Sequence, residues 1–66
     1  MIFTVPCSEY YRTKDQLALK ITEKVNSIER SRKCEFVTVF STEIQQATDE
    51  NDFNRMDMIL LFRDLD

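Results

Sequence analysis

A single stretch of this chain has the periodicity of an amphipathic α-helix. Between residues 14 and 33, apolar side chains recur every three or four positions and fall within about 100° of arc, the width of a helix face that packs on a core. Thr13 and Gln16 have the spacing of an N-terminal capping box, and the basic residues of the last turn suit the carbonyl end of a helix. The stripe comprises Leu17, Ala18, Ile21, Val25 and Ile28, whereas Leu19 projects from the polar side. We expect one long helix over residues 14–33.

Two further segments have the composition of β-strands. Residues 2–5 are rich in β-branched and aromatic side chains and are followed by Pro6, which lacks a backbone donor and favours a strand end. Residues 35–44 also favour a strand, and strict alternation would place Phe36 and Phe40 on the same face. The polar stretch that follows this second strand is expected to be a loop.

Residues 55–65 contain the most apolar run of the chain, MILLF, and two structures suit them. A strand would place Met58, Leu60 and Phe62 on one face. A helix is compatible with the Met and Leu content, but it would bring Asp57 and Asp64 into the apolar stripe. We favour a strand and retain a C-terminal helix as the alternative. As the most apolar strand, it is expected at the centre of the sheet, antiparallel to both neighbours.

The order strand, helix, strand, strand predicts a single small α+β domain over residues 1–66, with one amphipathic helix packed on a three-stranded sheet (β-α-β-β). The alternative is β-α-β-α with a C-terminal helix. A domain of this size buries only about 60% of the surface of its unfolded chain. One helix covers one sheet face, yet the strands carry apolar side chains on both. We therefore expect a homodimer with stacked sheet faces, whose interface residues are Phe36, Phe40, Met58, Leu60 and Phe62.

Composition excludes several kinds of chemistry. The chain has no His and no Gly, so His-based catalytic dyads, His-containing zinc sites and glycine-rich phosphate loops are all excluded. Cys7 and Cys34 lie 27 positions apart, which excludes a C-x-x-C redox motif. We expect no enzyme activity, no catalytic residues, no cofactor and no metal site. Without a signal peptide or an apolar run approaching about 18 residues, the expected location is the cytoplasm, with no membrane association and reduced thiols.

Charge is divided unevenly along the chain. Residues 1–34 carry 7 basic and 4 acidic side chains, whereas residues 35–66 carry 2 basic and 8 acidic side chains. An acidic surface keeps a small protein soluble, and it can also dock on a basic surface of a partner protein. The residues proposed for such partner binding are Glu43, Asp49, Glu50, Asp52 and Asp57.

Aromatic and basic residues flank the predicted helix and are the candidates for nucleic-acid contacts. They are Tyr10, Tyr11, Arg12 and Lys14 at its start, and Arg30, Arg32 and Lys33 at its end. Aromatic rings can stack on bases and cations can meet phosphates. The sequence pI of 4.8 and the lack of a continuous basic stripe argue against nucleic acid as the partner.

These features favour a small acidic protein-binding module that acts as an inhibitor or regulator by surface occlusion of a partner protein. In size, acidity and lack of Gly and His, the chain resembles the small accessory proteins that phages and mobile elements use to bind and block host proteins. Two alternatives stay open. One is a small homodimeric nucleic-acid-binding regulator, and the other is a structural subunit of a larger assembly.

Overall fold

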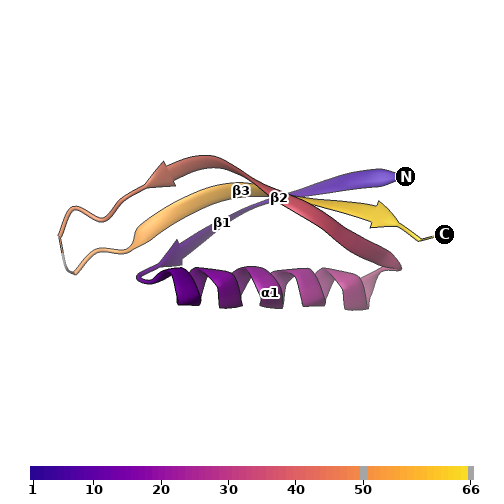
Figure 1. Ribbon diagram of the computed structural model, residues 1–66, viewed down its shortest axis with the longest axis horizontal. Helices are drawn as coiled ribbons and strands as arrows, with labels where there is room; N and C mark the ends of the chain where they lie inside the picture. Colours follow the sequence, from indigo (N-terminus) through magenta and orange to yellow (C-terminus); the bar gives the residue numbers. More distant parts are fainter. Residues whose placement is uncertain (50, 66) are drawn as a thin grey trace.

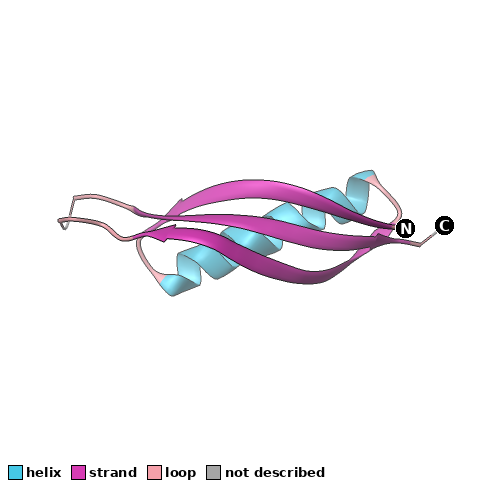
Figure 2. Ribbon diagram, turned by 90° about the horizontal axis from the view of Figure 1, so that it is seen from above, coloured by secondary structure: helices cyan, strands magenta, loops and turns pink. Residues whose placement is uncertain are grey.

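A computed structural model describes residues 1–49 and 51–65, which form one helix and three strands (Figure 1). In chain order these are β1 (Ile2–Tyr11), α1 (Lys14–Ser31), β2 (Cys34–Gln45) and β3 (Asn54–Asp64). The strands form one sheet in the order β1-β3-β2, and each neighbouring pair is antiparallel. α1 lies against one face of this sheet (Figures 1 and 2). The expected α+β fold, one helix on a three-stranded sheet, is confirmed.

β3 is the central strand, as the apolar run predicted. Met58, Leu60 and Phe62 are 2%, 0% and 0% exposed, so their side chains are sealed between the sheet and α1. Asp57 and Arg63 alternate with them and therefore project from the other face. The C-terminal helix alternative is wrong, because Asn54–Asp64 form a strand. The alternation of this strand keeps the two charged side chains away from the core.

The core forms where the helix stripe meets β3. Leu17, Ile21, Val25 and Ile28 pack against the buried residues from α1, whereas Ala18 is exposed. The Phe62 ring stacks on Phe3 at a centroid distance of 5.3 Å and meets the edge of Phe36 at 5.7 Å. Each such aromatic pair stabilises the fold by about 0.5–1.5 kcal/mol beyond the burial of its surface.

The two ends of α1 are fixed by different contacts. At the N-terminus, the backbone N–H of Gln16 donates to Thr13 Oγ1 (3.2 Å), and Gln16 Oε1 accepts from the backbone N–H of Arg12 (2.8 Å). The reciprocal arm of the capping box thus reaches one residue before the cap. The helix ends at Ser31, two residues earlier than expected, because Arg32 adopts an extended backbone that leads into β2.

β1 is longer than the predicted residues 2–5, and Pro6 does not end it. The backbone N–H of Asp64 donates to the carbonyl of Met1 (2.8 Å), which sets the hydrogen-bonding phase of the β1–β3 pair. In this phase the odd-numbered residues of β1 exchange backbone hydrogen bonds with β3. The backbone N–H and C=O groups of the even-numbered residues point away from β3, toward the free edge of the sheet. Pro6 therefore occupies a position where the missing N–H interrupts no bond to β3.

β2 contains two irregularities that change which face its side chains occupy. Its pairing with β3 shifts register between Phe36 and Thr38, and again between Ser41 and Glu43. Each shift inserts one extra residue opposite β3 and moves the alternation by one position. As a result Phe36 pairs with Phe62, on the helix side, whereas Phe40 pairs with Ile59, on the opposite side. The expectation that both rings share a face is wrong.

Substitutions on α1 distinguish its core stripe from its polar side. We expect Ile21→Asp or Val25→Asp to unfold the domain, because an unpaired carboxylate in this core costs about as much as the total stability of a small domain. Leu19 is 59% exposed, and Leu19→Asp should change the free energy of unfolding by less than about 1 kcal/mol. Circular dichroism during thermal unfolding measures both effects. A folded Ile21→Asp variant would contradict the assigned helix face.

Candidate protein-binding surface

The sheet face opposite α1 is uncovered by the described part of the chain. In Figure 2 the three strands lie in front of the helix, and no described segment crosses them on the near side. Residues paired across neighbouring strands project from the same face, so the printed register identifies the side chains that line it. We call this surface the open face.

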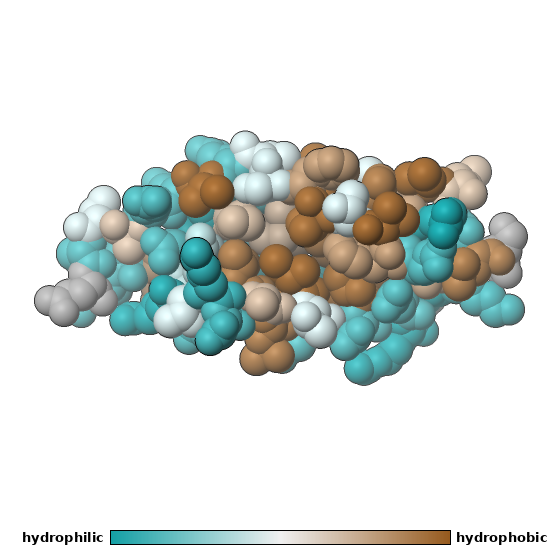
Figure 3. Space-filling view, in the orientation of Figure 1, coloured by the Kyte–Doolittle hydropathy of each residue, from teal (hydrophilic) through white to brown (hydrophobic). Residues whose placement is uncertain are grey.

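Two transverse rows form the centre of the open face, an apolar row and a row in which a leucine lies between two threonines. The first row runs from Pro6 on β1 through Ile59 on β3 to Phe40 on β2. The second row is centred on Leu61, which pairs with Thr4 and Thr38. The Phe40 side chain is 55% exposed although it is aromatic. Figure 3 shows the molecule side-on, with hydrophobic side chains gathered over its middle and right and hydrophilic ones over the loop end at the left.

Charged side chains border these rows at both ends of the strands. The charged residues beside Leu61 form what we call the first rim, where Arg63 makes an ion pair with Glu35 of β2. The charged residues beside Ile59, toward the other end of β3, form the second rim. There the Arg55 guanidinium lies 3.7 Å from the Glu43 carboxylate and 3.5 Å from the Asp57 carboxylate. Ser8 Oγ donates a hydrogen bond to Asp57 Oδ1 (2.6 Å). Arg55 Nε is buried and has no hydrogen-bond partner among the described residues. An apolar centre with charged rims is the usual anatomy of a protein–protein interface.

Most of the expected interface residues lie elsewhere. Met58, Leu60 and Phe62 are core residues beneath α1, and Phe36 packs partly buried against them. Of the five residues expected at a stacked interface, Phe40 lies on the open face. The sequence predicts an apolar surplus on the sheet, but the residues it points to lie on the face that α1 covers. The missed residues Ile59 and Leu61 alternate with the core residues, and this alternation was the available signal.

The predicted acidic patch is divided between two places. Glu43 and Asp57 belong to the second rim of the open face, where Arg55 offsets part of their charge. Asp49 and Asp52 lie in the described parts of the connection between β2 and β3 (residues 46–49 and 51–53), which project from one end of the molecule (Figure 1). In that loop Asp49 Oδ1 accepts from the backbone N–H of Asn51 (2.8 Å), and Asp52 Oδ2 accepts from Thr48 (2.6 Å). Glu50 lies outside the described residues.

The predicted nucleic-acid residues are not brought together. They lie in two groups at the two ends of α1, an 18-residue helix with a length of about 27 Å at 1.5 Å per residue. The Arg12 guanidinium lies 4.4 Å from the centre of the Phe53 ring. At the other end Arg32 stacks 3.8 Å above Phe3 and forms a bidentate pair with Asp64, with both bonds 2.9 Å long. The five other candidates lie at these same two ends: Tyr10, Tyr11 and Lys14 at the start of the helix, Arg30 and Lys33 at its end.

Two polar side chains of α1 contact the outer edges of the sheet. Lys20 Nζ donates to the carbonyl of Tyr10, an outward-facing group of β1. On the other side, Glu29 accepts from the backbone N–H of Phe36 on β2 (3.1 Å). Together with Pro6 and the two irregularities of β2, these contacts reduce the ability of either edge to pair with another strand.

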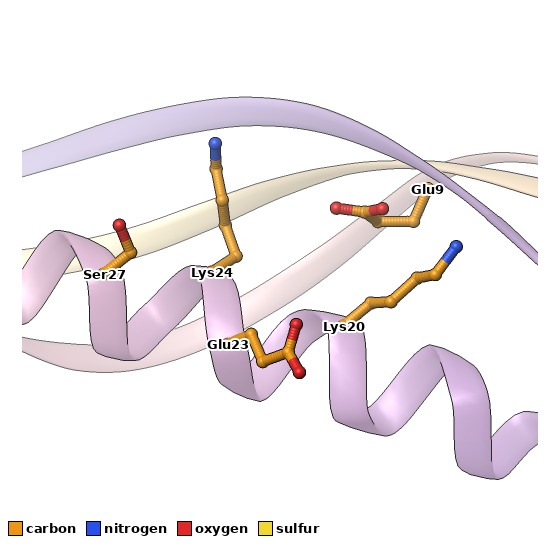
Figure 4. Close-up of a pocket in the computed structure, with 5 residues that line it drawn as sticks. All are labelled: Glu9, Lys20, Glu23, Lys24 and Ser27. Carbon is orange, nitrogen blue, oxygen red and sulfur yellow. The ribbon is translucent and has the colours of Figure 1, made fainter.

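A shallow hollow of about 400 Å³ lies between α1 and β1 and is lined by Glu9, Lys20, Glu23, Lys24 and Ser27. Figure 4 shows Lys20 and Lys24 extending from α1 toward β1, from which Glu9 projects. Two cations and two carboxylates give this hollow no net charge. It carries no feature that selects a ligand.

Both cysteines are free. Burial raises the pKa of the Cys7 thiol, with a smaller contribution from Glu9, and burial likewise raises the pKa of Cys34. Both thiols are therefore poor nucleophiles at neutral pH. Within residues 1–49 and 51–65, no three acidic or thiol side chains gather into a group that could hold a metal ion. The same residues contain no helix that is long and apolar enough to cross a membrane.

Comparison of the chain with protein-family models, curated protein sequences and solved structures finds no match.

The contacts of Arg32 predict a role in stability. Arg32→Gln removes a bidentate ion pair and a stacked cation, and should lower the free energy of unfolding by about 1 kcal/mol. Lys33→Gln, the control, removes a neighbouring charge of the same sign and should have a much smaller effect. Urea unfolding at low salt measures both variants. If both variants lower the free energy of unfolding equally, positive charge at the helix end, and not the contacts of Arg32 with Asp64 and Phe3, stabilises the fold.

Proposed function

We propose that the protein is a small protein-binding module that acts as an inhibitor or regulator by surface occlusion, and that it works as a homodimer. One observation carries the proposal, namely the open face, where the apolar side chains of Pro6, Phe40, Ile59 and Leu61 lie between charged rims. Soluble monomers rarely expose a contiguous apolar patch of more than a few hundred Å². A sheet face of this kind suits another polypeptide surface better than a small ligand, which is usually held in a concave pocket.

The acidic loop supplies a second element of the proposal. Asp49 and Asp52 are exposed at one end of the molecule, away from the rows centred on Ile59 and Leu61. Exposed charges of one sign accelerate encounter with an oppositely charged surface and disfavour partners of the same charge. The loop is therefore proposed to steer the module toward a basic surface of its partner protein.

A matched pair of variants tests whether the protein works through the open face. Phe40 and Leu19 are exposed to similar extents, 55% and 59%, but Phe40 lies on the open face and Leu19 on the polar side of α1. We expect Phe40→Lys to reduce capture of the partner protein from the source cells by more than about tenfold, because it places a charge in the apolar centre. Leu19→Lys should capture as much as the wild type. Quantitative mass spectrometry of captured proteins gives the comparison, and equal capture by both variants would overturn the proposal.

Charge reversal tests the acidic loop. Asp49→Lys combined with Asp52→Lys should leave the fold nearly intact, because exposed loop charges contribute little to stability. Association with the captured partner should become about tenfold slower at low ionic strength, and the difference should shrink as salt is added. The control combines Asp15→Lys with Glu23→Lys on α1, which changes net charge equally. Surface plasmon resonance measures both rates. If the control slows association as much, net charge and not the loop is responsible.

A further inference from the structure

We draw no further inference here: the strongest candidate, the open face of the sheet opposite α1, is the surface already proposed to bind the partner protein, and nothing in the described part of the chain shows what covers it.

Discussion

Every other feature of this molecule depends on the contact between β3 and α1. Three alternate side chains of the central strand, Met58, Leu60 and Phe62, are sealed from water by the apolar stripe of the helix. Buried apolar surface contributes about 25 cal/mol per Å², and this contact holds three of the four buried hydrophobic residues among those described. It also sets the two sides of the sheet, because the residues between these three must project from the open face.

The helix contributes more than its apolar stripe. It crosses the sheet diagonally, from the end of β1 to the start of β2 (Figure 2), which brings one of its polar residues to each edge. Lys20 meets a carbonyl of β1 and Glu29 meets an N–H of β2. Both contacts satisfy backbone groups that would otherwise be open to strand addition. A single helix therefore covers one face of the sheet and occupies backbone groups on both of its edges. The opposite face, the open face, remains exposed.

Much of the fold could be predicted from local patterns. The stripe from Leu17 to Ile28 has helical spacing, and MILLF, the most apolar run, lies at the centre of the sheet as expected. The predicted end of β1 at Pro6 was wrong, because whether a proline interrupts a ladder depends on the direction in which its nitrogen faces. The candidate site was predicted less well. Phe36 and Phe40 were placed together, although a single extra residue in β2 separates them to opposite faces.

The sequence by itself determined the helix, the first two strands and their order, since these follow from periodicity, capping residues and apolar content within short windows. For residues 55–65 it favoured a central strand but left a helix open. The tertiary structure decided which face of the sheet receives the helix, and hence that Met58, Leu60 and Phe62 are core while Phe40, Ile59 and Leu61 remain outside. It also decided that Arg32 joins Asp64 and Phe3 across the fold. The physical reason is that both faces of β3 are apolar enough to be buried. The choice between them is made by residues far apart in the chain, through register, strand irregularities and the path of one helix.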